Sequence, residues 1–393
     1  MSIRGMRSKT LSGQAAIYHT MQPNRSLVCG FLALTALGSL SLKAALTPDE
    51  GSGLFVTGTL GEQYNDNLFL RTHNAKSDYI TTLTPGLEYD FGANSQTQGM
   101  VSYQEAFARY DSDSNQNSNL GDATMNLTYN NDRTKGSLNA SFVQLDSNDV
   151  GLRNDNIFIR RDVTMASGNG EWGMSEKTSF AIGGNYTHTE YKQAGFPNSS
   201  IYALPIDVYY KMTPDVDMSL DYQFRESDIT GLQSYQDNYL GVGARGQFTE
   251  KFSGLFSVGA TERSWQHSGG TQWMPGGHAT FTYLVTPKTT FQFGGSEDFN
   301  SAAAGTSQKS LSGWAGVQTN FEGDFSASAK VTYEHLSYLT GIHDEYWKAE
   351  LGLQYQLNKY VSFKAGYTYM NDSTDYNSDF TDNVFSISGT VRF

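Results

Sequence analysis

Oppositely charged residues stand two or four positions apart at several places in this sequence, a spacing that puts both side chains on one face of an extended chain. These pairs are Arg160 and Asp162, Asp221 and Arg225, Lys330 and Glu334, and Lys348 and Glu350. Such pairs neutralise each other and hold a wall together, or they line a surface that hydrogen-bonds a polar solute. Both uses are compatible, and neither is catalysis.

Other candidates for chemistry are weak. Asp111-Ser112-Asp113-Ser114-Asn115 begins like a calcium loop, but Gln116 and Asp122 stand where Gly and Glu are needed. No two histidines have zinc-ligand spacing, and the single Cys29 excludes a disulfide or a cysteine-based metal site. No Ser, His and acidic set stands out. We therefore expect no metal, no cofactor and no enzyme.

The elements that carry the charged pairs are extended strands. From residue 53 onward apolar and polar residues alternate with period two, as in Val361–Tyr369 and Phe325–Tyr333. The polar positions hold mostly Ser, Thr, Gly, Asn and Gln rather than the Lys and Glu of a water-exposed sheet, and many apolar positions are Tyr or Phe. This pattern predicts a transmembrane antiparallel β-barrel with apolar residues toward lipid and a polar lumen.

Short polar turns set the strand count. They centre near residues 93, 132, 175, 214, 250, 287, 323 and 358, and Asp-, Asn- and Ser-rich connections separate them. Eight turns separate nine hairpins, which predicts 18 strands with both ends of the chain on the short-turn, periplasmic side. Sixteen strands remain possible if one hairpin lies outside the barrel. The terminal Phe393 after an alternating strand predicts a signal for barrel assembly in the membrane.

The N-terminal part differs from the rest. Basic residues precede the uncharged stretch Leu27–Leu42, which predicts a signal peptide over residues 1–45, with Met21 as an alternative start, and a barrel domain over residues 46–393. Residues 1–45 carry five basic and no acidic groups, so 22 basic and 40 acidic residues leave the barrel domain with a charge of about −18. Such a surface excludes nucleic acid as a partner. The expected location is the outer membrane of a Gram-negative bacterium.

Extending the alternation assigns charged residues of both signs to the lumen. Tyr239, Trp265 and Tyr346 are possible surfaces on which sugar rings stack, although each is also typical of a loop or an interfacial belt. Asp-Asn pairs at the strand borders, such as Asp66-Asn67 and Asp382-Asn383, either cap strands or form an acidic ring at the mouth. The predicted lumen residues are Glu88, Asp90, Arg160, Asp162, Asp217, Asp221, Arg225, Arg245, Arg263, Lys330, Glu334, Lys348, Glu350, Lys364 and Arg392.

Residues 64–89 resemble the opening hairpin of the beta-barrel porin family found in bacterial exopolysaccharide export loci. The matching motifs are Asp66-Asn67 before an aromatic residue, Ser77-Asp78, and Pro85-Gly86-Leu87, whereas Asn65 replaces a frequent second Asp. The resemblance implies an outer-membrane channel of about eighteen strands that exports a polysaccharide. It implies periplasmic polysaccharide-export components as partners, beside membrane lipid and the barrel-assembly machinery.

Two other functions remain open. A general or substrate-specific diffusion porin would constrict its pore with an inward loop, for which residues 193–200 or 264–277 are candidates. A third class is an adhesin-like or purely structural barrel. Neighbouring genes for glycosyltransferases would favour export.

Overall fold

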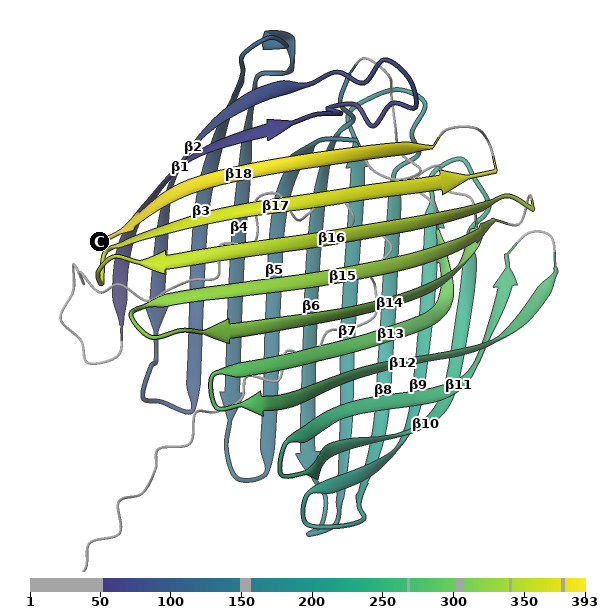
Figure 1. Cartoon of the computed structure of the whole chain (residues 1–393). Coiled ribbons are helices and arrows are strands. Elements are labelled where there is room, and N and C mark those ends of the chain that lie inside the picture. Colours follow the sequence, from purple (N-terminus) through teal and green to yellow (C-terminus); the bar gives the residue numbers. More distant parts are fainter. Residues whose placement is uncertain (1–51, 149–156, 267–268, 302–306, 339–340, 376–378) are drawn as a thin grey trace, which may run out of the picture.

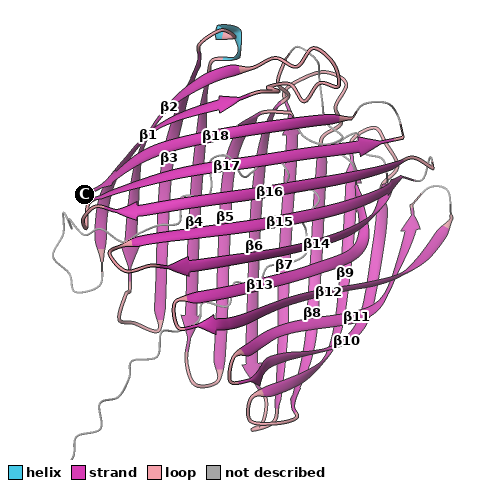
Figure 2. Ribbon diagram, viewed as in Figure 1, coloured by secondary structure: helices cyan, strands magenta, loops and turns pink. Residues whose placement is uncertain are grey.

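The computed structural model describes residues 52–148, 157–266, 269–301, 307–338, 341–375 and 379–393, and the predicted signal peptide lies outside them. These residues form eighteen strands and one 3₁₀ turn, Ser114–Gln116 (Figure 2). The strands are β1 Gly53–Asn65, β2 Asp78–Phe91, β3 Thr97–Tyr110, β4 Ser118–Asn130, β5 Thr134–Asp146, β6 Arg160–Gly173, β7 Thr178–Tyr191, β8 Ser199–Lys211, β9 Val216–Ile229, β10 Tyr235–Thr249, β11 Phe252–Trp265, β12 Thr271–Thr286, β13 Thr289–Ser301, β14 Ser307–Asn320, β15 Phe325–Tyr338, β16 His343–Gln356, β17 Val361–Thr374 and β18 Phe380–Arg392.

The strands close into one antiparallel barrel (Figure 1). Each strand pairs with its neighbours in the chain, and β1 pairs with β18 from Thr57 opposite Arg392 to Asn65 opposite Val384. The prediction of 18 strands is confirmed, and the alternative of sixteen is wrong. Among the described residues no helix is long and apolar enough to cross a membrane.

Connection lengths differ between the two ends of the barrel. All eight predicted turns are turns in the structure, at residues 92–96, 131–133, 174–177, 212–215, 250–251, 287–288, 321–324 and 357–360. At the opposite end, the connections between β1 and β2 and between β5 and β6 are long, while those after β8 are short. The chain enters β1 and leaves β18 at the short-turn end.

The outer face of the barrel is apolar. Large apolar side chains at every second position are exposed, for example Leu240, Val242 and Val258 at 56–59%. Alternate positions turn inward: Phe363 is 44% exposed, whereas Ser362 beside it is 7% exposed. A membrane barrel has this inverted arrangement, because lipid rather than a protein core covers its apolar side chains.

Phe393 completes the seam at which the barrel closes. Its backbone N–H donates to the Val56 carbonyl at 2.9 Å, and the Val56 N–H donates to the Phe393 carbonyl at 2.8 Å. Its ring stacks on Tyr360 with centroids 5.3 Å apart. Its role as an assembly signal stays a prediction.

Candidate functional site: the barrel interior

A buried ion network lies inside the barrel on β9, β10 and β11. Asp237 accepts hydrogen bonds from Arg225 Nε at 2.8 Å and from Arg263 Nε at 2.7 Å, and both arginines also donate through Nη2. Asp237 and Arg263 are at most 2% exposed, and Arg225 is 5% exposed. One carboxylate thus holds two guanidinium groups, whose remaining N–H groups reach further across the barrel.

The far end of β13 supplies those further partners. Arg225 Nη1 donates to Asp298 Oδ2 at 2.7 Å, and Arg225 Nη2 donates to the Phe299 carbonyl at 2.9 Å. Arg263 Nη1 donates to the Asn300 carbonyl at 3.0 Å, and the Arg263 guanidinium lies 4.7 Å from the centroid of the Phe299 ring. β9–β11 are therefore tied to a strand that is not their neighbour in the sheet.

These contacts require that β13 leaves the wall. β12 pairs with β11 up to Thr271, but with β13 only up to Gly277, which faces Glu297. Beyond that point the end of β13 lies on the inner side of β9–β11, and the β11–β12 hairpin diverges from it (Figure 1). Pro275 of β12 lies in the segment without β13 partners, where its missing N–H costs no ladder bond. The end of β13 thus lies inside the ring of strands, whereas most of the candidate loop 264–277 forms β11 and β12.

A second ion network lies nearer the short turns. Arg245 of β10 donates to Glu171 of β6 at 2.9 and 2.6 Å and to Asp217 of β9 at 3.1 Å. Its guanidinium stacks 3.4 Å from the ring centroid of Tyr209. β6 and β10 are four strands apart, roughly 19 Å along a flat sheet. The wall must therefore curve sharply between them, and Arg245 fills the inside of that bend.

A third group of inner charges lies at the seam. Arg392 of β18 forms ion pairs with Glu88 and, at 2.8 Å, with Asp90 of β2, and its guanidinium lies 3.6 Å from the Phe55 ring centroid. Away from the seam, on β16, Lys348 pairs with Glu350 at 2.9 Å. In each case a cation on the inner face is matched by a carboxylate.

Most predicted lumen residues alternate with exposed apolar side chains such as Leu220, Val331, Trp347 and Phe363, so they lie on the inner face. Of the predicted pairs along one strand, Lys348 and Glu350 meet, whereas Arg225 binds Asp237 and Asp298 instead of Asp221. The inner residues are Glu88, Asp90, Asp217, Asp221, Arg225, Arg245, Arg263, Lys330, Glu334, Lys348, Glu350, Lys364 and Arg392.

The placement of Arg160 and Asp162 in the lumen is corrected. Phe142 on the outer face is 38% exposed and faces Thr164, and the next same-face pairs are Gln144 with Asp162 and Asp146 with Arg160. Both residues therefore lie on the outer face. The inward positions belong to Arg161, which donates to the Ser147 and Ile159 carbonyls, and to buried Val163. An apolar inward residue here reverses the alternation that the prediction assumed.

The three aromatic candidates differ. Tyr239 lies flat along the inner wall: a Cβ on Gly241 would be 2.7 Å from Tyr239 Cζ, and the hydroxyl bonds Ser257 at 2.7 Å. Trp265 ends β11 on the same inner face and is partly exposed. Tyr346 is 1% exposed, so it offers no stacking surface, which corrects that prediction.

Loop residues line the opposite side of the long-loop mouth. Leu68 and Phe69 pack with Ile80 and Phe158, all at most 7% exposed, against Ala108 and Tyr110. Asn67 anchors this apolar cap: its side chain donates to the Arg71 and Thr381 carbonyls at 2.8 Å and accepts from the Arg71 N–H at 2.8 Å.

The Asp-Asn pairs that lie in the described residues connect neighbouring strands by hydrogen bonds or ion pairs. Asp66 accepts from the Asn383 N–H and side chain at 2.7 Å, and the Asn65 side chain donates to Asp382 at 3.3 Å. The pairs Asp66-Asn67 and Asp382-Asn383 are therefore hydrogen-bonded to each other's strands across the seam between β1 and β18. In a third pair, Asp237 belongs to the ion network with Arg225 and Arg263. A further Asp-Asn pair at a predicted strand border, Asp155-Asn156, lies outside the described residues.

Sequence reasoning missed Glu171 and Asp298 and did not recognise Asp237 as the centre of a network. Their arginine partners are 74, 73 and 12–26 residues away, so no local spacing reveals them. Asp237 alternates with the inner residue Tyr239, which was the available signal. Within the described ranges no three His, Cys, Asp or Glu side chains gather as a metal site.

Comparison with protein families shows that residues 234–393 match the model described as "Putative beta-barrel porin 2". Comparison with curated protein sequences found no match.

Similar solved structures include Pseudomonas aeruginosa OccK2 (OpdF) with glucuronate, at 11% identity and a TM-score of 0.49, covering 87% of this chain and 98% of that one. Acinetobacter baumannii OccAB4 has 15% identity and a TM-score of 0.46, with 88% and 100% covered. Pseudomonas aeruginosa OpdK with vanillate has 10% identity and a TM-score of 0.47, with 86% and 99% covered.

The closed barrel with its apolar exterior and the family match over β10–β18 agree on one class of protein. The chain is an 18-stranded β-barrel of the outer membrane of a Gram-negative bacterium, with the architecture of a porin channel.

Proposed function

We propose that the barrel is an aqueous diffusion channel for small polar solutes, narrowed near its outer mouth. The inward end of β13, held by Arg225 and Arg263, carries this proposal. Barrels of 16–18 strands enclose an aqueous lumen, so an element that folds inward sets the size of what passes. The apolar cap of Leu68, Phe69 and Phe158 narrows the mouth from the other side.

The preferred solutes are neutral and hydroxyl-rich. Asp237 is matched by two arginines, Arg245 by Glu171 and Asp217, and Arg392 by Glu88 and Asp90. Internally matched charges leave little net field to attract one sign of ion. The Tyr239 ring on the wall suits the apolar face of a sugar ring.

Planar-bilayer conductance and liposome swelling with sugars of increasing size test this proposal. Asp298→Ala removes the carboxylate that holds the end of β13, so we expect higher conductance and entry of larger sugars. Lys288→Ala, in an exposed turn at the other end, is the control. A wild-type barrel that folds but conducts nothing would refute the channel.

Export of an exopolysaccharide is the second candidate. The matched charges and hydroxyl- and amide-rich wall favour it, since a polymer needs weak contacts without a trap of one sign. It would require periplasmic polysaccharide-export components as partners, and the cap would have to open. Deleting the gene separates the two: loss of extracellular polysaccharide with normal sugar uptake supports export, and the reverse supports the diffusion channel.

A further inference from the structure

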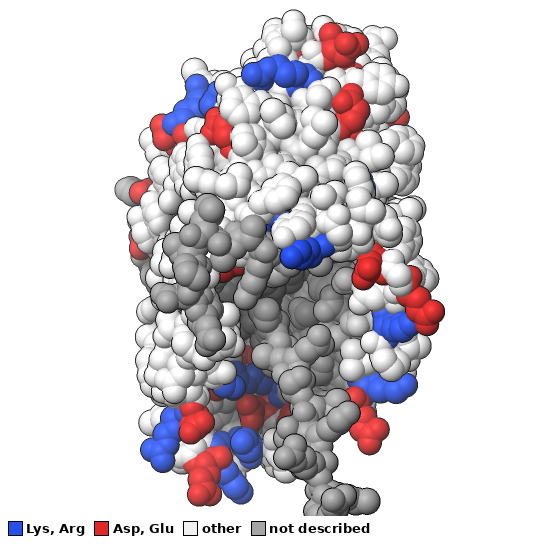
Figure 3. Space-filling model, turned by 90° about the vertical axis from the view of Figure 1, so that its left-hand side faces the viewer, with Lys and Arg blue, Asp and Glu red and all other residues white. Residues whose placement is uncertain are grey.

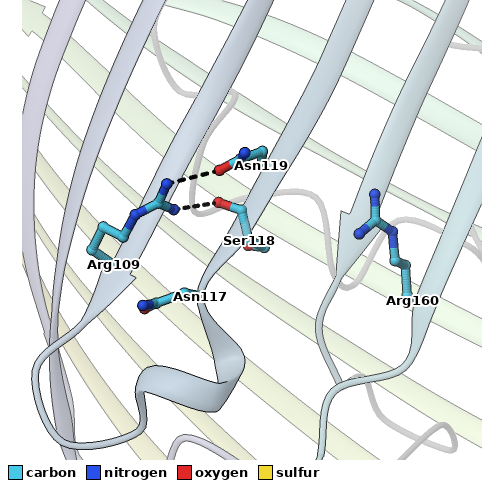
Figure 4. A pocket seen from close by; sticks show the side chains of 5 residues that line it. All are labelled: Arg109, Asn117, Ser118, Asn119 and Arg160. Carbon is cyan, nitrogen blue, oxygen red and sulfur yellow. Dashed lines mark hydrogen bonds between the residues drawn. The ribbon is translucent and has the colours of Figure 1, made fainter.

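A cavity of about 580 Å³ lies in the barrel wall at the long-loop end (Figure 4). It is lined by Arg109, Asn117, Ser118, Asn119 and Arg160. The cavity exists because β4 and β5 pair only from Asp122 opposite Val143 onward. The preceding part of β4 has no partner in β5, and the Gln144 side chain bridges to the Gly121 N–H at 3.1 Å.

The two arginines lie on the outer face of the barrel. Arg109 follows Phe107, which faces Leu83, and Leu83 is 52% exposed on the apolar exterior. The Arg109 guanidinium lies 6.0 Å from the Phe107 ring centroid. Arg160 lies four residues, about 13 Å along the strand, beyond the level of exposed Phe142. Cations directly outside the apolar surface lie at the level of lipid headgroups.

The hydrogen bonds of Arg109 leave one edge of its guanidinium available. Nη1 donates to the Ala108 and Ser118 carbonyls at 2.7 and 2.9 Å, and Nη2 donates to Asn119 Oδ1 at 3.0 Å. Among the described residues Nε–H has no partner, and Nη2 carries a second N–H. Adjacent Nε–H and Nη2–H groups are the fork with which an arginine binds two oxygens of an oxyanion. The other bonds hold this fork in place.

Arg160 supplies a second cation to the cavity. No hydrogen bond or ion pair joins its guanidinium to another described residue. Asp146 faces it across the β5–β6 pairing and offsets part of the charge. The neighbouring carboxylates Asp162 and Glu190 are both taken by Lys192, at 3.0 and 2.8 Å.

We propose that this cavity binds the phosphate of an anionic lipid headgroup in the outer leaflet, through the free fork of Arg109 and the guanidinium of Arg160. A lipid is favoured over free phosphate because the cavity opens directly above the apolar exterior at Phe107 and Phe142. The site lies on the opposite face of the wall from the lumen, so it is independent of the solute that the channel conducts.

Native mass spectrometry of the full chain in detergent tests the site. The lipids added are lipid A, with two phosphate groups, phosphatidylglycerol, and phosphatidylcholine as the zwitterionic control. We expect lipid A to bind and Arg160→Gln or Arg109→Gln/Arg160→Gln to weaken it roughly tenfold or more. Arg133→Gln, in the short turn at the far end of the β4–β5 hairpin, should bind as the wild type does.

Two further measurements sharpen the test. Asp146→Asn removes the carboxylate that faces Arg160 across the β5–β6 pairing, so lipid A should bind more tightly. Inorganic phosphate at millimolar concentration should not displace the lipid, and displacement would overturn the lipid assignment. Unchanged binding by Arg160→Gln would overturn the site itself. The Arg160 side chain has no hydrogen bond to another described residue, so this variant is expected to fold, as a heat-modifiability gel checks.

Discussion

Two regions at the long-loop end of the barrel are held together by different interactions. On the β2–β3 side, Leu68, Phe69, Ile80 and Phe158 form an apolar cap from two loops and a strand end. On the β9–β11 side, Arg225, Arg263 and Asp237 hold the end of β13 through directed ion pairs and hydrogen bonds. Apolar packing depends on buried area and tolerates small shifts, whereas a buried charge needs its partner in one place.

This difference predicts different responses to mutation. Removing atoms from the cap leaves a cavity that the loops partly refill. Removing one charge from the network leaves the others buried without compensation, although a buried ion pair adds little net stability while intact. The network therefore serves mainly to fix where β13 lies. Figure 3 shows side chains of both signs over one face of the barrel, including the lower part of the hollow on that face.

The largest effect is expected for Asp237→Asn. It leaves two buried guanidinium groups with Asp298 as their remaining carboxylate, so the free energy of unfolding should fall by about 3–5 kcal/mol. Urea unfolding of the refolded barrel in detergent measures this. Asp324→Asn in an exposed turn is the matched control. A loss equal to that of the control would mean that the network holds nothing in place.

Phe69→Ala should cost less, about 3 kcal/mol, because the surrounding loops can collapse into the space. The same urea titration measures it, and conductance should become noisier as the cap loosens. Leu60→Ala, on the lipid-covered exterior, is the comparison for loss of an apolar side chain outside the cap. Lower conductance in Phe69→Ala than in wild type would contradict a narrowing role.

Asn67→Ala tests what joins the cap to the barrel. Three hydrogen bonds of a side chain only 2% exposed are lost, so we expect about 1–3 kcal/mol of destabilisation. Limited proteolysis within residues 68–77 should accelerate. Asn119→Ala is the control, since its bond to Arg109 lies outside the cap. Equal cleavage in both variants would show that Asn67 does not anchor the loop.

The smallest effect is expected for Lys288→Ala. Its ion pair with Glu322 spans 3.3 Å between side chains that are 56% and 93% exposed, so its loss should change stability by less than about 0.5 kcal/mol. Urea unfolding at low and at high salt checks this. A salt-dependent loss larger than that of Asp237→Asn would invert the comparison between buried and exposed charges.

The strands, the turns and the two faces of the barrel wall can be predicted from the sequence alone. Period-two alternation reports which side chains meet lipid, and polar turns mark where each strand ends, because both are local properties of the backbone. All eight turns, the count of 18 strands and the inward position of Arg225, Arg245 and Arg263 follow from these patterns.

Which residues meet across the barrel depends on how the strands close in three dimensions. Arg245 reaches Glu171 because the closed sheet curves between β6 and β10. Arg225 reaches Asp298 because the end of β13 separates from β12. Neither the curvature nor the separation can be recognised from the local spacing of residues. Arg160 lies on the outer face because the inward positions of this strand end include the apolar residue Val163, which is buried. Apolar residues elsewhere in the strands mostly face lipid, so the local pattern indicated the opposite face for Arg160. Strand identity depends on nearest neighbours in the chain, whereas the lumen, its narrowing and the outer cavity depend on where eighteen strands close.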